Sequence, residues 1–473
     1  MQLTLAHLLY ALSDWHPDEL EMPVYPIIDS REAEPGTVFF AFEGERVDGH
    51  DYVGDAFAHG AVAAVVQKRI TPAGSGTLVD LVEMEVPVGP LTTPIVILVP
   101  DVLEALQRAA RWWRTQIPAR VIGVTGSVGK TTTKEVVSRV LERRFQVARS
   151  RGSYNNEIGL PLTILRLTGE DERVVLEMGM YVRGDIRFLA GIARPDVGVV
   201  TNVEPVHAER AGTIEDIARG KRELVEVLPP GPEGVAILNF DDARVRAMAP
   251  YTAARIVTYG LSPEADLWAD GVESEGLQGL KVTLHEGNEV VDMSVPLLGR
   301  HSVYPVLRAA AVARAEGLDW DEIAAGLQTV ASLRLVAVPG KDGSTIIDDT
   351  YNSSPPSALA ALDLLEDLQG RKVAVLGDML ELGDYEREGH LEVGCRAAEV
   401  VSELVVVGAL GEIIGEGAEA CGLAPNRIHR AADSSAAVEI VQALLQPDDV
   451  VLVKGSRGVR MERIVEALRE SAS

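Results

Sequence analysis

The chain has 473 residues, enough for about three domains at roughly 100–200 residues each. Hydrophobic residues make up 47% and charged residues 24%, values typical of a folded globular protein and not of a disordered one. With 71 acidic and 44 basic residues the formal net charge is −27, which excludes a nucleic-acid partner held by bulk positive charge. Only eight of the basic residues are lysines, at positions 68, 130, 134, 221, 281, 341, 372 and 454.

The ends and the cysteines predict a cytoplasmic protein. The first 15 residues have apolar side chains at helical spacing and no basic leader, so we expect an amphipathic helix rather than a signal peptide. The sequence contains no run of about 18 apolar residues, the length needed to span a bilayer. Cys395 and Cys421 are too few for a disulfide framework, and we expect small buried side chains in a reducing compartment.

Residues 1–117 alternate short strands and helices and predict a first α/β domain. We expect strands at 37–42, 61–67 and 95–99, and helices at 51–60 and 101–116, the last one stopped by Pro118. The segments 71–78 and 86–94 are rich in Gly, Pro, Ser and Thr and predict loops.

Residues 118–332 and 333–473 predict two further α/β domains. Continuous Val/Ile/Leu runs alternate with helical patterns, which is typical of a parallel sheet covered on both faces. Residues 255–300 differ, because alternating apolar residues and Gly turns predict an antiparallel β insertion. The predicted fold class is therefore α/β, with a central P-loop-type, mostly parallel sheet and a Rossmann-like C-terminal domain.

The strongest chemical signal is the segment GVTGSVGKTT at 123–132. A strand leads into a glycine-rich turn and a helix, so backbone N–H groups and the helix N-terminus face a bound anion. Lys130 can reach the β- and γ-phosphates, and the Thr131 hydroxyl can ligate Mg²⁺. The spacing departs from the strict phosphate-loop pattern, yet its place after a strand predicts a nucleoside triphosphate site.

Polar residues at other strand ends add to this site. Glu177 closes a strand, where a carboxylate suits a hard cation, although a solvated strand end remains an alternative. His207 follows another strand, and a lone loop histidine is usually not a ligand. Lys221 lies on the apolar face of a helix that begins near Ile214, so it is either a paired buried cation or a reactive amine.

Three strand ends of the C-terminal domain carry polar clusters and predict the other half of an interdomain cleft. The clusters contain Asp348, Asp349 and Asn352, then Gly377 and Asp378, then Lys454 and Arg457. Any one of them could be ordinary turn chemistry, but together they favour a substrate site.

These segments resemble the Mur ligases along the whole chain. The similarity rests on TGSVGKTTTKE, NNEIGLPLT, LEMGM, VHAERAGTIEDIARGKREL, DDTYNSSP, LGDMLELG and VKGSRG, and on DSREAEPGTVFFAFEGERVDGHDYV near the N-terminus. Within the family, TTTK, NNEIGLPLT and DDTYN-SSP point to the branch that adds D-alanyl-D-alanine rather than a third amino acid.

The resemblance implies a reaction and its partners. ATP would phosphorylate the terminal carboxylate of UDP-N-acetylmuramoyl-tripeptide, and the amine of D-alanyl-D-alanine would attack the acyl phosphate to form the pentapeptide. The enzyme would serve peptidoglycan synthesis, and hence cell shape and division. We expect a monomer that uses Mg²⁺, with no nucleic acid and no membrane span.

The resemblance also assigns residues. Lys130, Glu177, His207 and Lys221 would be catalytic, with metal held by Thr131, Glu177, His207 and a CO₂-carboxylated Lys221. ATP would contact Thr125, Gly126, Ser127, Val128, Gly129, Lys130, Thr131 and Thr132, together with Arg334 through its phosphate and Asp349 near its ribose. The substrates would contact Ser30 and Arg31 (uridine), Asn155 and Asn156 (muramoyl peptide), and Asn352, Lys454 and Arg457 (dipeptide).

Two positions depart from the family pattern. The family's His-Asn-x-x-Asn, whose second Asn reads adenine, is His301-Ser-Val-Tyr-Pro305 here, and proline offers neither an amide side chain nor an N–H. The glycine before the phosphate-contacting arginine is Leu333, at the expected hinge between the second and third domains.

Two other functions stay open on the sequence. One is a different ligase of the superfamily, acting on another amino acid or of the folylpolyglutamate type, against which the uridine-binding N-terminal segment argues. The other is a phosphate-loop switch whose ATP hydrolysis drives binding of a partner.

Overall fold

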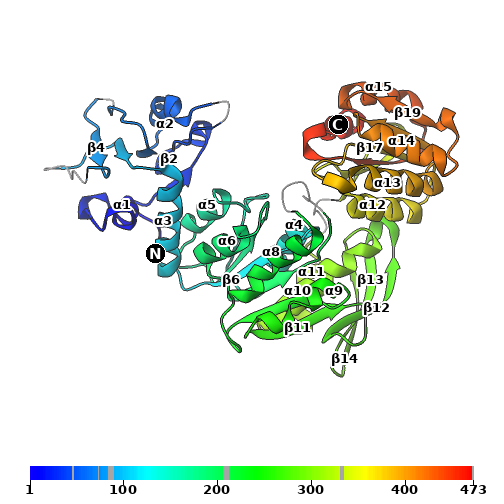
Figure 1. The fold of residues 1–473 in the computed structure, drawn as a ribbon, viewed down its shortest axis with the longest axis horizontal. Helices are drawn as coiled ribbons and strands as arrows, with labels where there is room; N and C mark the ends of the chain where they lie inside the picture. The colour runs from blue at the N-terminus through cyan, green and yellow to red at the C-terminus, as the bar shows by residue number, and fades with distance from the viewer. Residues whose placement is uncertain (45–46, 73, 84–89, 206–211, 331–334, 471–473) are drawn as a thin grey trace.

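The computed structural model describes residues 1–44, 47–72, 74–83, 90–205, 212–330 and 335–470. It contains three β-sheets that follow one another along the chain, each covered by helices. The N-terminal and C-terminal sheets lie at the two ends of the molecule, and the central sheet connects them (Figure 1). The predicted fold class is confirmed, whereas the predicted limits at 117 and 332 stay predictions, and the second one falls on a residue outside the described part.

The N-terminal sheet is wholly parallel, in the order β1-β2-β3-β5-β4. The predicted helices and strands are present, but β4 begins at Thr77 inside a segment that we expected to be a loop. The elements are α1 (Leu5–Ser13), β1 (Tyr25–Ile27), β2 (Thr37–Phe40), α2 (Val53–Ala58), β3 (Ala63–Val66), β4 (Thr77–Asp80), β5 (Ile95–Leu98) and α3 (Val102–Gln116).

The central sheet has nine strands in the order β14-β13-β12-β11-β10-β9-β6-β8-β7. The six strands that come first along the chain are parallel to one another. They are β6 (Arg120–Thr125), β7 (Val147–Arg149), β8 (Arg173–Glu177), β9 (Val197–Val200), β10 (Val235–Asn239) and β11 (Arg255–Gly260). Alternate residues of β6 face opposite sides, since Val121 belongs to one apolar core and Ile122 to another. The predicted burial on both faces is therefore confirmed.

Helices cover both faces of this sheet. On one face, α4 (Lys130–Leu141) packs with α10 (Val303–Ala315) and α11 (Trp320–Leu327). On the other face are α3, α5 (Gly159–Leu165), α6 (Asp185–Ala193) and α8 (Ile214–Glu226), with the short α9 (Ala243–Arg246) beside α8.

The predicted β insertion extends the edge of the central sheet. After β11, the strands β12 (Leu267–Ser274), β13 (Leu280–Glu286) and β14 (Glu289–Val295) form an antiparallel meander. β12 itself pairs in parallel with β11, so the insertion continues the main sheet instead of forming a separate one.

The C-terminal sheet has the order β15-β16-β20-β17-β18-β19, and only the pair β15–β16 is antiparallel. Its strands are β15 (Val336–Pro339), β16 (Thr345–Asp349), β17 (Lys372–Gly377), β18 (Glu403–Val407), β19 (Ile428–Ala431) and β20 (Val450–Lys454). The helices α12 (Pro355–Asp367), α13 (Glu386–Val400) and α14 (Gly411–Ala420) cover one face, and α15 (Ser434–Leu444) and α16 (Glu462–Leu468) cover the other.

The expectation for the two cysteines is wrong. Cys395 on α13 and Cys421 after α14 are joined by a disulfide of 1.97 Å, and Cys421 is exposed. The two helices pack closely side by side, which brings together residues 26 positions apart. Sequence spacing alone could not show this, because the pairing depends on how the helices pack.

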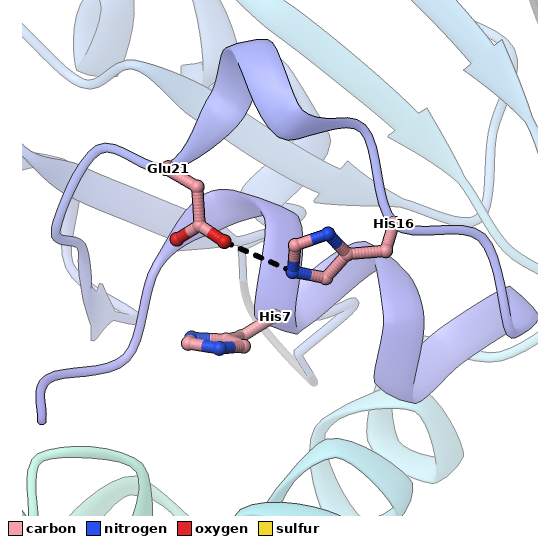
Figure 2. Close-up of side chains that lie close together, drawn as sticks. All are labelled: His7, His16 and Glu21. Carbon is pink, nitrogen blue, oxygen red and sulfur yellow. Dashed lines mark ion pairs between the residues drawn. The ribbon is translucent and has the colours of Figure 1, made fainter.

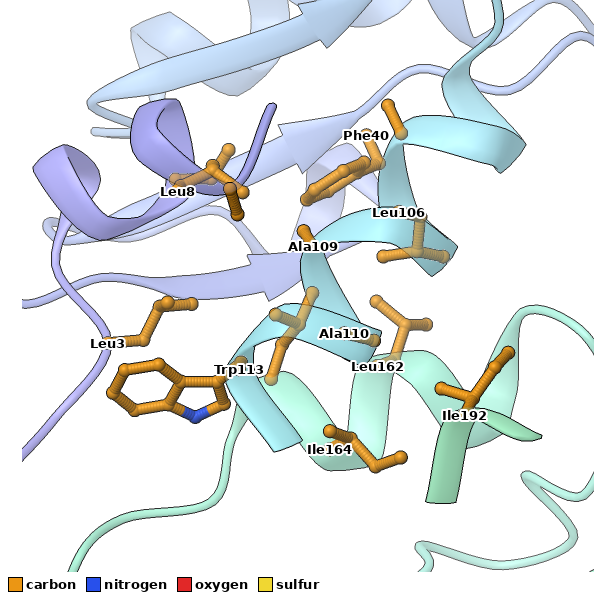
Figure 3. Packing of buried hydrophobic residues seen from close by; sticks show 14 of the residues in the cluster. Leu3, Leu8, Phe40, Leu106, Ala109, Ala110, Trp113, Leu162, Ile164 and Ile192 are labelled. Carbon is orange, nitrogen blue, oxygen red and sulfur yellow. The ribbon is translucent and has the colours of Figure 1, made fainter. Parts of the chain in front are cut away.

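Helix α3 joins the N-terminal sheet to the central domain. Its buried residues Leu106, Ala110 and Trp113 pack in one continuous apolar cluster with Phe40 on one side and Leu162 on the other (Figure 3). The Trp113 indole N–H donates to the carbonyl of Leu167 at 2.9 Å. These two parts therefore share a core, while the C-terminal sheet has cores of its own.

His7, His16 and Glu21 cluster beside α1, with the His16 Nε2 atom 3.0 Å from the Glu21 carboxylate (Figure 2). The Nδ1 atom of His7 accepts the Thr4 N–H at 3.3 Å as part of the cap of α1. A neutral His7 ring in this arrangement carries its proton on Nε2 and has no lone pair left for a cation. The cluster is thus a helix cap beside an ion pair.

Among the described helices, none is long and apolar enough to cross a membrane.

Candidate active site

The loop between β6 and α4 (residues 126–129, the phosphate loop) is shaped by two glycines. Gly126 has φ +145°, and a Cβ built there would lie 1.8 Å from the Thr201 hydroxyl. Gly129 has φ +83° and caps α4 without a side chain. The Val128 N–H donates to the Asn202 side chain at 2.9 Å, which ties the loop to the end of β9. Because no side chain caps α4, the N–H groups at its N-terminus are available to an anion.

Lys130 bends back over this loop. Its Nζ donates to the carbonyls of Gly126 at 2.8 Å and Ser127 at 3.1 Å. The ammonium group thus lies over the loop, where the phosphates of a nucleotide would bind.

Thr131, Glu177 and Asn155 form a connected group at the carboxyl ends of the strands. The Thr131 hydroxyl donates to one carboxylate oxygen of Glu177 at 2.6 Å, and the Asn155 amide donates to the other at 2.8 Å. Glu177 is 2% exposed and has no cationic partner among the described residues. A buried carboxylate beside a hydroxyl is a donor set that suits Mg²⁺, so these residues fit the expected metal.

Lys221 lies on α8 and reaches the same region from the opposite side. It is 5% exposed, and its Nζ has no hydrogen bond or ion pair to any described residue. Burial, with a smaller contribution from the charge of Lys130, lowers the pKa of Lys221 well below its usual value. The structure therefore favours a neutral amine there over a paired cation.

The C-terminal strand ends supply a second polar group. Lys454 is 2% exposed, and its Nζ donates to the Asp349 carboxylate at 2.6 Å and to the Asn352 carbonyl at 2.9 Å. These contacts join the ends of β16 and β20, which are neighbouring parallel strands. Arg457 lies just beyond, with its guanidinium 5.4 Å from the ring centre of Tyr351.

The central-domain residues around Glu177 and Lys221 and the C-terminal residues around Lys454 open into one cleft. This cleft has a volume of about 1010 Å³ and lies between the central and C-terminal domains. The predicted site residues that line it are Gly126, Ser127, Val128, Gly129, Lys130, Thr131, Thr132, Asn155, Asn156, Glu177, Lys221, Asp349, Asn352 and Lys454.

The other predicted residues lie elsewhere. Thr125 is buried under the loop, with its hydroxyl donating to the Met178 carbonyl at 3.0 Å, and Arg457 is not part of the cleft lining. Ser30 and Arg31 belong to the N-terminal domain, where the exposed Arg31 pairs with Asp29 at 2.5 Å. His207 and Arg334 lie outside the described residues, as does Leu333.

Helix α10 contributes residues that the sequence did not single out. Tyr304, Pro305 and Arg308 line the cleft, and the Tyr304 hydroxyl donates to Asp241 at 3.0 Å. Pro305 stands in the first turn of the helix, where it offers only its ring to the cleft. The available signal for Arg308 was one arginine within the apolar run VYPVLRAAAVA, the same kind of signal that marked Lys221.

A second cavity of about 540 Å³ lies between the N-terminal and central domains. Tyr25, Arg151 and Arg166 line it, among others. The Nε atom of Arg166 is buried without a hydrogen-bond partner among the described residues. An arginine with an unused donor suits an anionic ligand.

Comparison with protein families gives three matches along the chain. Residues 27–114 match the Mur ligase family catalytic domain, residues 124–313 the Mur ligase middle domain, and residues 333–457 the Mur ligase glutamate ligase domain.

Individual proteins are similar over nearly the whole length. The UDP-N-acetylmuramoyl-tripeptide–D-alanyl-D-alanine ligase of Bacillus subtilis is 36% identical over 448 residues, covering 94% of this chain and 92% of that protein. A crystal structure of MurF from Acinetobacter baumannii has a TM-score of 0.82 at 28% identity, covering 98% and 97% of the two chains. MurF from Thermotoga maritima, solved with ADP, has a TM-score of 0.77 at 28% identity, covering 94% and 96%.

Proposed function

The chain belongs to the Mur ligase family, and from this premise we propose that it joins D-alanyl-D-alanine to UDP-N-acetylmuramoyl-tripeptide at the expense of ATP. The product is the UDP-linked pentapeptide of peptidoglycan synthesis. One observation carries the proposal: the phosphate loop, Glu177 and Lys221 share a single cleft with the C-terminal residues Asp349, Asn352 and Lys454. Such a cleft can hold a nucleotide and two substrates side by side.

The first step is transfer of the γ-phosphoryl group to the terminal carboxylate of the tripeptide. The backbone of residues 126–129 and the Lys130 ammonium hold the phosphates, because N–H groups and a cation there compensate their charge. In the second step the dipeptide amine attacks the acyl phosphate, and phosphate leaves as the amide forms. Closure of the cleft over the bound substrates would exclude water, which would otherwise hydrolyse the acyl phosphate.

Thr131 and Glu177 would hold Mg²⁺, as their oxygens and the buried charge of Glu177 support. When bound, the ion neutralises charge on the phosphates. Asn155 fixes the orientation of the Glu177 carboxylate through its amide. By the family resemblance, His207 would serve a second ion.

Lys221 is proposed to be carboxylated. A neutral amine can attack CO₂ to form an N-carboxylate with release of one proton, and burial shifts the Lys221 amine towards this neutral form by lowering its pKa. The resulting anion would add a metal ligand and would replace an isolated buried amine with a coordinated group.

The remaining assignments follow the family pattern. Arg334 would contact ATP phosphate and Asp349 the ribose, while Asn155 and Asn156 face the muramoyl peptide. Asn352, Lys454 and Arg457 would lie near the dipeptide. Ser30 and Arg31 would hold uridine. The 540 Å³ cavity lined by Arg166 would bind an anionic part of the same substrate. A monomer in the cytoplasm, where ATP is available, completes the proposal.

Phosphate release in the presence of each substrate alone and of both together tests this function. We expect release only with both UDP-N-acetylmuramoyl-tripeptide and D-alanyl-D-alanine. Release that ignores both would support the switch alternative and overturn the ligase. Parallel assays with diaminopimelate and lysine at the third position of the tripeptide identify the preferred substrate.

A further inference from the structure

Arg308 is a buried cation whose position the fold does not explain. It is 5% exposed on α10, and its Nε donates to the Tyr304 carbonyl one turn earlier at 3.0 Å. The two terminal nitrogens have no hydrogen-bond or ion-pair partner among the described residues. The ring centre of Tyr259 lies 5.9 Å from its guanidinium carbon. A buried guanidinium with four unused N–H donors is costly unless a ligand uses them.

These terminal nitrogens lie against the phosphate loop. A Cβ built on Gly129 would be 3.3 Å from Nη1 and 3.5 Å from Nη2 of Arg308. Arg308 also lines the 1010 Å³ cleft. Among the described residues, the fully buried side-chain atoms without a hydrogen-bond partner are Arg166 Nε and Trp320 Nε1, so the unpaired terminal nitrogens of Arg308 are not sealed off from solvent. The free donors therefore open into the cleft beside the N-terminus of α4.

The surroundings of Arg308 favour an anion. Burial lowers the pKa of Arg308, opposed by Tyr259 and Tyr304, and no carboxylate contributes to that balance. Of the other α10 residues that line the cleft, Pro305 has no donor, and the Tyr304 hydroxyl donates to Asp241. Arg308 is thus the donor that α10 presents to a ligand.

We propose that Arg308 binds the phosphate chain of the nucleotide, from the α10 side of the loop and in addition to Lys130. The inference rests on the proposed function for the identity of the ligand, a nucleoside di- or triphosphate. A guanidinium can donate two parallel hydrogen bonds to phosphate oxygens, which a lysine ammonium cannot. Arg308 therefore fixes the orientation of the phosphates as well as their charge.

Calorimetric titration with ADP, GDP and inorganic tripolyphosphate, each with Mg²⁺, tests this role without either peptide substrate. We expect Arg308→Met to weaken all three by about 10- to 100-fold, because charge-assisted hydrogen bonds are lost whatever the base. Arg308→Lys should retain part of the affinity, and Arg308→Gln should resemble the Met variant. The matched control is Arg314→Met on the same helix, whose guanidinium pairs with Glu286 and Glu289 outside the cleft.

Unchanged affinities in Arg308→Met, or a loss confined to ADP, would overturn the proposal, since the second result would mean contact with adenine. If the Met variant does not fold, the comparison of Arg308→Lys with Arg308→Gln decides, because these differ in charge: equal affinities would contradict a phosphate contact. The assay is independent of ligation. A wild-type protein that binds ADP but ligates nothing would count against the proposed function and leave this inference standing.

Discussion

Two buried lysines of the central domain differ in whether their amines have partners. Lys134 is fully buried, but its Nζ donates to the carbonyls of Ser150 and Gly152, each at 2.7 Å, and pairs with Glu135 at 3.0 Å. Lys221 is also buried, at 5% exposed, and has no such contact among the described residues. A buried amine without partners prefers its neutral form, the form that reacts with CO₂. This contrast supports the proposal that Lys221, and not Lys134, is the carboxylated residue.

We expect Lys221→Ala to lower ligation by more than about 100-fold, because the proposed metal ligand is lost. A short-chain carboxylic acid added to this variant should restore part of the activity by supplying the missing carboxylate. Lys281→Ala, an exposed lysine on β13, is the control and should ligate as the wild type does. Full activity of Lys221→Ala would refute the carboxylation.

At this scale the sequence predicted many of the residues that line the cleft. Lys130, Thr131 and Glu177 meet because parallel strands end at one edge of the sheet, a rule that needs no coordinates. Arg308 was not foreseen, since its contact with Gly129 depends on how α10 packs on α4. The prediction for the two cysteines was wrong for the same reason, because helix packing brings the two sulfurs together.

Among the elements, the long apolar strands were predictable, while short edge strands were not. β4, β15 and β19 each have four residues and stand at or next to a sheet edge. Short edge strands carry a weak apolar pattern, so neighbouring strands decide whether they form. The edge strand β4 consequently appeared as a loop in the sequence.

The loop after β17 depends on a buried histidine of α13. The Nε2 atom of His390 accepts the Met379 N–H at 3.0 Å, and its Nδ1 lies 2.6 Å from the Glu386 carbonyl. Burial lowers the pKa of His390, so the native state disfavours protonation. Its contribution to stability is present above the ordinary pKa of about 6.5 and is lost as pH falls below it.

We therefore expect the Met379 amide to lose protection from hydrogen exchange between pH 7.5 and 5.5, beyond the intrinsic change in rate. The loss should not exceed about tenfold per pH unit, since one proton is involved. His390→Gln should remove this pH dependence, and His59→Gln, at an exposed site, should preserve it. The same pH dependence in His390→Gln would show that another group is responsible.

Across the whole molecule, the net charge of −27 and the binding of two anionic substrates are compatible. Three of the eight lysines, Lys130, Lys221 and Lys454, line the cleft together with Arg244 and Arg308. Acidic residues line the same cleft, among them Glu177, Asp241 and Asp349. The cations matter through their positions, because Lys130 lies over the phosphate loop and Arg308 lies beside Gly129. The bulk charge therefore says little about the site.

The shared core around α3 predicts which domain moves on binding. The N-terminal and central domains are packed together through α3, whereas the C-terminal domain has separate cores. With spin labels at Asp18, Glu170 and Glu439, we expect nucleotide and UDP-substrate to shorten the Glu170–Glu439 distance more than the Asp18–Glu170 distance. A larger change between Asp18 and Glu170 would contradict a rigid core. As the control, the same two distances are measured with added salt in the absence of ligands.

The central claim is ligation through an acyl phosphate, and isotope transfer tests it most directly. UDP-N-acetylmuramoyl-tripeptide with ¹⁸O in both oxygens of its terminal carboxylate is incubated with ATP, Mg²⁺ and D-alanyl-D-alanine, and the phosphate and the pentapeptide are analysed by mass spectrometry. Attack of the carboxylate on ATP carries one of its oxygens into the phosphate. The account predicts one ¹⁸O atom in each phosphate released, in equal amount to the pentapeptide. Unlabelled phosphate, or labelled phosphate without pentapeptide, would contradict it.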